Sequence, residues 1–132
     1  MGDRAVIGFR ASSTSGTPVW LYTHWTGSRR YDHVKEALEK SRSRWNDPSY
    51  ATRIAISAIV GDDWNQEHGY GLTAGDDGFC VPDYSDVPVI CWQDRLVLIL
   101  NVNADFSSPM ASKNFADTLS STGQVLVGKL RW

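Results

Sequence analysis

The first candidate site in this sequence is a short segment, His24-Trp25-Thr26-Gly27-Ser28-Arg29-Arg30. It joins an expected strand to an expected helix, and free backbone N–H groups at the start of a helix attract anions. The glycine lets a ligand approach the backbone closely, and the paired arginines donate hydrogen bonds to phosphate or carboxylate. The segment is not a Walker loop, because the spacing and the lysine are missing. It predicts either an anion site or a polar loop with solvated arginines.

The second candidate site is an acidic run that spans residues 62–68. Asp62, Asp63, Glu67 and His68 carry the oxygen and nitrogen atoms that bind divalent cations, so a metal-dependent hydrolase is one hypothesis. The spacing fits neither an EF-hand nor a zinc motif, and adjacent aspartates point in different directions unless the loop bends sharply. The alternative is an acidic loop that is simply solvated.

Six tryptophans among fifteen aromatic residues are the unusual feature of the composition. Rings near helix ends and loops can stack on a base, contact a partner protein or complete a small core. The rings in such positions are Trp25, Tyr31, Trp45, Tyr50, Trp64 and Tyr70. Arg53 lies in a helix that we expect to be largely buried, so its charge needs either an acidic side chain or an anionic ligand.

These observations together predict a ligand site without catalytic residues. The expected ligand-binding residues are His24, Trp25, Gly27, Ser28, Arg29, Arg30, Arg53, Trp64 and Tyr70. The chain has no G-x-S-x-G nucleophile elbow, and the H-x-T pattern of two-histidine phosphoesterases occurs only once, at His24. We therefore expect a binding protein in preference to an enzyme, and no cofactor.

Composition and charge limit the class of protein. A chain of 132 residues is the size of one domain, so residues 1–132 are expected to form a single unit. A net charge of −2 disfavours non-specific binding to nucleic acid, which usually requires a basic surface. No apolar run approaches the roughly 20 residues of a membrane span. Cys80 and Cys91 are interpreted as reduced and buried, although they can also pair across neighbouring strands.

The sequence pattern predicts strands and helices in the order β-β-α-α-β-β-β-α-β. Strands are expected at residues 5–10, 19–24, 70–74, 87–92, 95–102 and 125–130, and helices at 32–44, 47–60 and 109–119. Asp47 and Pro48 are a typical helix start, and Gly61 stands where a helix ends. A two-residue turn at 93–94 is expected to join the strongest strand pair. The helix at 47–60 is expected to lie at the centre of the domain.

Strands that arrive mostly as hairpins favour an antiparallel sheet. We therefore predict an α+β fold, in which a mainly antiparallel sheet carries two to three helices on one face. The hairpin at 87–102 is a candidate for edge-to-edge pairing in a homo-oligomer.

Two stretches resemble small uncharacterised proteins encoded by bacteriophages of actinobacteria. One is the run from Trp45 to Ile56, followed by Ile59-Val60-Gly61 and Gly69-Tyr70-Gly71-Leu72; the other begins at Asp3 and includes Tyr22-Thr23-His24-Trp25. The resemblance covers roughly residues 3–100 and transfers no catalytic residue. It implies expression in the cytoplasm of an infected bacterium, and a role in which the protein binds a host protein or sequesters a nucleotide signal.

Three functions follow as hypotheses. The first is a non-enzymatic binder of a small anionic, nucleotide-like ligand, which requires Arg29, Arg30 and Arg53 to converge beside flat rings. The second is a module that binds and inhibits a host protein through exposed aromatic side chains. The third is the metal-dependent hydrolase at Asp62, Asp63, Glu67 and His68.

Overall fold

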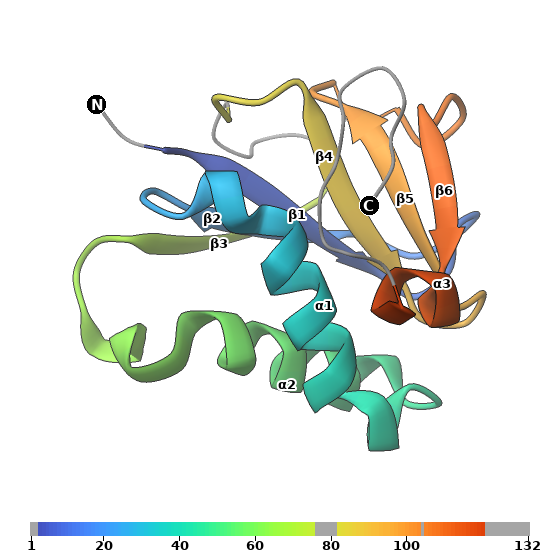
Figure 1. Ribbon diagram of the computed structural model, residues 1–132, viewed down its shortest axis with the longest axis horizontal. Coiled ribbons are helices and arrows are strands. Elements are labelled where there is room, and N and C mark those ends of the chain that lie inside the picture. The colour runs from blue at the N-terminus through green and yellow to red at the C-terminus, as the bar shows by residue number, and fades with distance from the viewer. Residues whose placement is uncertain (1–2, 76–81, 104, 121–132) are drawn as a thin grey trace.

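The computed structural model describes residues 3–75, 82–103 and 105–120. These residues form a six-stranded sheet with the order β3-β2-β1-β4-β5-β6, and helices cover one of its faces (Figure 1). The strands are β1 (Ala5–Arg10), β2 (Val19–Thr23), β3 (Tyr70–Ala74), β4 (Asp86–Cys91), β5 (Leu96–Asn101) and β6 (Ala111–Asn114). Among these residues β1 and β4 pair in parallel, and the other neighbouring strands pair antiparallel. The predicted α+β fold is confirmed.

The helices are α1 (Arg30–Lys40), α2 (Pro48–Val60) and the short α3 (Phe115–Ser120), with 3-10 turns at Gly27–Arg29, Arg42–Arg44 and Gly61–Asn65. The Asp47 side chain accepts a hydrogen bond from the backbone N–H of Tyr50, and Pro48 opens α2, as predicted. Gly61 ends the helix with a φ of +62°, a conformation that other residues rarely adopt. The first helix begins two residues earlier and ends four residues earlier than predicted.

Both faces of the sheet are buried around its central strands. On the helix side, Ile7, Phe9, Leu21 and Trp92 pack with α1 and α2 into the larger core cluster. On the opposite side, Val6 and Trp20 belong to a second cluster with residues of β4 and β5. Side chains of successive strand residues point to opposite faces, so the apolar character of β1 at both odd and even positions requires this double burial.

The expected central position of the helix at 47–60 is wrong. Ala51, Ala55, Ile56, Ile59 and Val60 are buried, but the opposite side of α2 is open to solvent at Arg53. Burial of one stripe is enough for a helix that packs on a sheet from outside. The strands β1 and β4 occupy the centre of the sheet instead.

The end of the described chain differs most from the prediction. The expected helix at 109–119 is wrong, because Ala111–Asn114 forms β6, which pairs with β5, and α3 covers only Phe115–Ser120. Pairing satisfies the backbone groups of the outer edge of β5, which outweighs weak local preferences. The expected strand at 125–130 and Cys80 lie outside the described residues. Cys91 is a buried free cysteine.

The strand pair at 87–102 is confirmed, but its turn is longer than two residues and includes Arg95 at a φ of +56°. Each of its strands has a neighbour on both sides, since β4 lies beside β1 and β5 lies beside β6. This hairpin therefore has no open edge, and the predicted route to a homo-oligomer is wrong.

Candidate functional site

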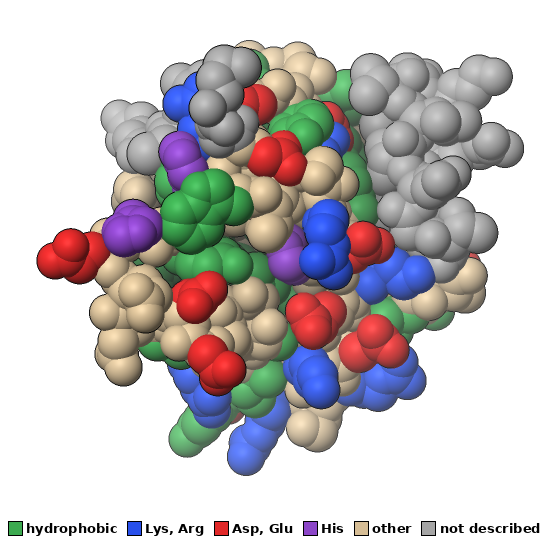
Figure 2. Space-filling view, turned by 60° about the vertical axis from the view of Figure 1, so that its left-hand side comes forward, with side chains coloured by type: hydrophobic (Ala, Val, Ile, Leu, Met, Phe, Trp, Pro, Cys, Tyr) green, Lys and Arg blue, Asp and Glu red, His purple; other side chains and the backbone are tan. Residues whose placement is uncertain are grey.

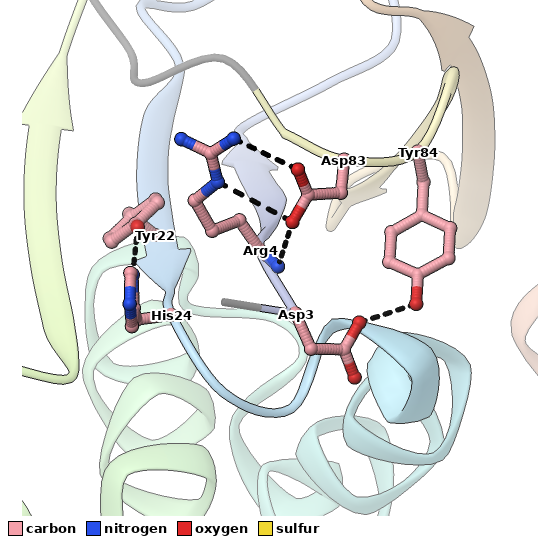
Figure 3. Close-up of polar contacts among 6 residues, drawn as sticks. All are labelled: Asp3, Arg4, Tyr22, His24, Asp83 and Tyr84. Carbon is pink, nitrogen blue, oxygen red and sulfur yellow. Dashed lines mark hydrogen bonds and ion pairs between the residues drawn. The ribbon is translucent and has the colours of Figure 1, made fainter. Parts of the chain in front are cut away.

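The predicted anion site at the start of α1 is filled by the chain's own Asp3. The backbone N–H of Ser28 donates to the Asp3 carboxylate at 3.0 Å, and the N–H of Gly27 donates to the Asp3 carbonyl at 2.7 Å. The Tyr84 hydroxyl donates to the second carboxylate oxygen of Asp3 (Figure 3). Hydrogen bonds from Tyr84 and Ser28 lower the pKa of Asp3, because they stabilise its charged form.

Gly27 has a structural role in this arrangement. A Cβ atom at this position would lie 2.6 Å from the Asp3 carbonyl oxygen and 2.9 Å from the Tyr84 ring. The missing side chain thus lets residues 3–4 approach the turn before α1, where we expected a ligand to approach. Arg4 fixes the same segment through an ion pair of 2.9 Å with Asp83 (Figure 3).

Arg30 forms a buried ion pair within the protein. Its side chain is buried, and it donates two hydrogen bonds of 2.9 Å to the carboxylate of Asp86 at the start of β4. A third hydrogen bond of 2.9 Å goes to the Gly27 carbonyl, and the guanidinium lies 3.9 Å from the centre of the Tyr84 ring. The expectation that Arg30 binds a ligand is wrong, because its charge already has a buried partner.

The other two arginines do not join Arg30. Arg29 is exposed and lies 3.9 Å from Asp32, and Arg53 is exposed on α2. One guanidinium therefore points into the protein while two point into solvent. The convergence that an anionic ligand requires is not found.

His33 connects the start of α1 to the end of β2. Its Nε2 lies 2.9 Å from the Thr26 hydroxyl, which lies 2.8 Å from the hydroxyl of Thr23. Burial is the main cause that lowers the pKa of His33, because it disfavours the charged ring; the Arg29 charge adds to the effect.

We expect the protein to lose stability as the pH falls below about 6.5, the ordinary pKa of histidine. In that range the unfolded chain binds a proton at His33 that the folded chain does not bind. The free energy of unfolding, measured by urea denaturation at a series of pH values, should therefore depend less on pH in His33→Gln than in the unmodified protein. Equal slopes for the two proteins between about pH 7 and pH 5 would contradict this assignment.

The acidic run does not form a metal centre. Within residues 3–75, 82–103 and 105–120, no group of three His, Cys, Asp or Glu side chains can hold a metal ion. Asp62, Asp63, Glu67 and His68 are all exposed. Asp63 lines one pocket while Glu67 and His68 line another. The predicted metal-dependent site is therefore wrong.

The structure does bring other predicted residues together, around the start of β3. A pocket of about 380 Å³, which we call the histidine pocket, is lined by Tyr22, His24, Trp25, Glu67, His68, Gly69 and Tyr70. The Trp25 ring is 54% exposed and lies between two imidazoles, with centroid distances of 5.7 Å to both His24 and His68. Both pairs of rings are nearly perpendicular. Tyr22 Oη lies 2.6 Å from His24 Nδ1 (Figure 3).

A second pocket lies between β3 and the end of α2. This tryptophan pocket of about 180 Å³ is lined by Leu21, Val60, Asp63, Trp64, Gln66, Tyr70, Gly71 and Leu72. Trp64, in the 3-10 turn Gly61–Asn65, is 50% exposed, and Leu72, on β3, is 53% exposed. Exposed apolar side chains that lie together mark candidate interaction surfaces. Tyr70 lines both pockets, so they adjoin. Figure 2 shows a face on which histidine, acidic and hydrophobic side chains lie close together.

Both pockets combine aromatic rings with acidic side chains. Their only charged side chains among the described residues are Asp63 and Glu67, and neither lining contains lysine or arginine. Carboxylates and the faces of aromatic rings attract cations and repel anions. The pockets therefore favour a positively charged ligand, the opposite of the charge that we expected.

Cys91 and His24 carry side chains that serve as a nucleophile or a base in many enzymes. Burial raises the pKa of Cys91 to about 12, so its thiol is not a nucleophile at neutral pH. His24 has a tyrosine as its hydrogen-bond partner in place of the serine, cysteine or carboxylate of a catalytic pair.

Comparisons with known proteins identify no relative. No family model, no curated protein and no solved structure matches the chain. Within the part of the chain that is described, no helix is both long and apolar enough to cross a bilayer.

Sequence reasoning missed the contributions of Tyr22, Gly69 and Leu72 to the two pockets. Leu72 follows the alternating pattern of a strand, and that pattern predicts a side chain in the core. Its exposure arises because α2 ends at Val60 and leaves the outer part of β3 uncovered. The signal that points to this surface is the density of rings between residues 64 and 72, together with the two acidic residues.

Proposed function

We propose that this protein is a non-enzymatic recognition module that binds a positively charged segment of another protein. The observation that carries the proposal is the pair of adjoining pockets, in which exposed Trp25 and Trp64 accompany Glu67 and Asp63. Tryptophans of this kind often supply most of the binding energy of an interface. The carboxylates select the sign of the partner's charge. The resemblance to phage proteins suggests a bacterial host protein as the source of the segment.

This proposal follows the second of the three hypotheses from the sequence. A small anionic ligand is disfavoured because Asp3 fills the helix start and Asp86 neutralises Arg30. A protein partner is favoured because the two pockets meet at Tyr70, on the edge strand β3. Two separate anchors suit a chain that spans both of them better than a small molecule held in one.

A library of random peptides displayed on yeast and selected against the full chain tests this function. We expect the selected peptides to be rich in lysine and arginine. Their affinity should fall by at least about tenfold for the double variant Trp25→Ala, Trp64→Ala, as measured by calorimetry. The matched control is Tyr50→Ala, because Tyr50 is also 50% exposed but lies at the far end of α2.

A second pair of variants tests the role of the Asp63 and Glu67 carboxylates. Asp63→Asn with Glu67→Gln should weaken binding and reduce its dependence on salt, because fewer charges attract the peptide. Asp32→Asn with Glu36→Gln removes the same charge from exposed positions on α1 and should leave binding unchanged. Peptides that are acidic, or that bind both tryptophan variants equally well, would overturn the proposed function.

A further inference from the structure

We infer that the partner segment binds as an additional strand along β3, with side chains on its two faces entering the two pockets. This inference rests on the proposed function and adds the binding mode. Strand addition to an open edge is a common way for a protein to recognise an extended peptide. Main-chain hydrogen bonds supply affinity in this mode, and pockets for alternate side chains supply specificity.

The hydrogen bonds of β3 show which backbone groups face outward. The Gly69 carbonyl accepts from the N–H of His24 at 3.0 Å, and the Gly75 N–H donates to the Pro18 carbonyl at 3.0 Å. In an antiparallel pair, residues alternate between those that bond to the neighbouring strand and those that face away. The odd positions of β3 therefore bond to β2. The N–H and C=O groups of Tyr70, Leu72 and Ala74 point to the open side.

This edge lacks the features that usually prevent strand addition. β3 is the last strand of the sheet among the described residues, and its sequence Tyr-Gly-Leu-Thr-Ala contains neither proline nor a charged residue. Protected edges commonly carry lysine or proline, or are very short. The opposite edge fits that description, since β6 is four residues long and contains Lys113. The edge at β3 therefore has the features of a recognition edge, and the edge at β6 has those of a protected edge.

The two pockets are lined from opposite faces of the sheet. Leu21 and Leu72 are directly paired, and Leu21 belongs to the core on the helix side, so the tryptophan pocket opens on that side. Tyr22 follows Leu21 in β2, so its side chain points to the other face, where its hydroxyl lies 2.6 Å from His24 Nδ1 and both residues line the histidine pocket. Successive side chains of an added strand also alternate between faces. The residue numbers of two anchoring side chains should therefore differ by an odd number, as at positions i and i+3.

Charge identifies the occupant as a basic segment and not as a second copy of this chain. A copy of β3 placed against β3 would bring Tyr70–Ala74, which has no basic side chain for Asp63 or Glu67. Lysine or arginine at the two anchoring positions would pair with those carboxylates and lie against Trp64 and Trp25. A cation over an aromatic face is favourable in addition to the ion pair.

Short synthetic peptides test the spacing. The peptides have an alternating threonine and valine background and carry two lysines. Peptides with lysines at positions i and i+3 should bind at least about fivefold more tightly than peptides with lysines at positions i and i+2 or i and i+4. Replacing both lysines with glutamate should abolish binding. Equal binding of odd and even spacings would overturn the placement of the anchors on opposite faces.

Modified backbones test the strand itself without any change to the protein. N-methylation of successive peptide residues should weaken binding at every second position, where the peptide N–H donates to β3. On the protein side, Leu72→Pro removes an outward N–H and should weaken binding by about tenfold. The hydrogen bonds to β2 are made by the odd positions of β3, so this substitution does not remove them. Leu72→Thr is the matched control, because it shortens the side chain and keeps the N–H. Circular dichroism would verify that both variants fold.

The outcomes separate the binding mode from the proposed function. If basic peptides bind through Trp25 and Trp64 but show no alternation with N-methylation, the strand geometry is wrong and the recognition function stands. If no basic peptide binds, both are wrong. If the protein sediments as a dimer that Leu72→Pro dissociates, the edge of β3 pairs with a second copy and the assignment of a basic partner is overturned.

Discussion

Replacing Asp86 with alanine is expected to destabilise the protein by about 3–5 kcal/mol, because the substitution leaves the charge of Arg30 buried without its partner. The side chain of Arg30 is 8% exposed and that of Asp86 is 3% exposed, so water cannot replace the lost carboxylate. Asp86 also accepts a hydrogen bond from the Tyr31 hydroxyl. The substitution therefore removes partners from two buried groups at once, and its effect should exceed that of an ordinary surface ion pair.

A double variant separates the loss of a partner from the value of the ion pair. Arg30→Met with Asp86→Leu removes both charges and should be more stable than Asp86→Ala alone, since buried ion pairs contribute little over apolar residues of similar size. Asp83→Ala is the control for the exposed Arg4–Asp83 pair and should cost much less. Urea denaturation followed by circular dichroism measures all three. A loss for Asp86→Ala as small as that for Asp83→Ala would contradict the burial of the pair.

The pairing of Arg30 with Asp86 illustrates why the expected anion site failed. Fifty-six positions separate the two residues, and only the parallel pairing of β1 with β4 brings the start of β4 to the start of α1. Asp3 and Ser28 meet in the same way, through the path of the chain before β1. The local sequence predicts an anion at this segment, and the carboxylate that accepts a hydrogen bond there belongs to the chain itself. The local sequence does not show which residue from a distant part of the chain binds to this segment.

Most of the fold could be predicted, because its signals are local. Alternation identified the β1–β2 hairpin and β3, and the cap at Asp47 with Gly61 located α2. The parallel pairing of β1 with β4 had no local signal, and β6 was missed because Ala111–Asn114 carries no strand pattern. Its pairing depends on the exposed edge of β5, a property of the tertiary structure.

The candidate site was predicted in part. His24, Trp25, Trp64 and Tyr70 are among the residues that line the two pockets, and Glu67 and His68 join them from the rejected metal cluster. The sequence placed these residues in two candidate sites of opposite charge. The structure combines one part of each, because the antiparallel pairing of β2 with β3 brings the residues after β2 beside the residues before β3. The electrostatic character of the combined surface is that of its acidic members.

Some tryptophan rings lie in the core and others lie on the surface. The loss of a core ring is expected to have the second large effect on stability. Trp92 is fully buried, stacks on Phe9 with a centroid distance of 6.4 Å, and meets Phe115 at 5.9 Å. Its Nε1 donates to the Thr52 hydroxyl at 2.9 Å, so the ring joins the sheet to α2. Trp92→Ala is therefore expected to destabilise the protein by about 3–5 kcal/mol, through the cavity and the lost hydrogen bond.

Two further variants separate those two contributions and connect them to the site. Thr52→Val keeps the ring and removes only the hydrogen bond, and it should cost about 1 kcal/mol. Trp64→Ala removes an equal volume from a half-exposed position and should cost less than about 1 kcal/mol. Urea denaturation of the three variants tests this order, and a loss for Trp64→Ala equal to that for Trp92→Ala would contradict it. The contrast matters for function, because a surface ring that leaves folding intact when removed can be tested for binding alone.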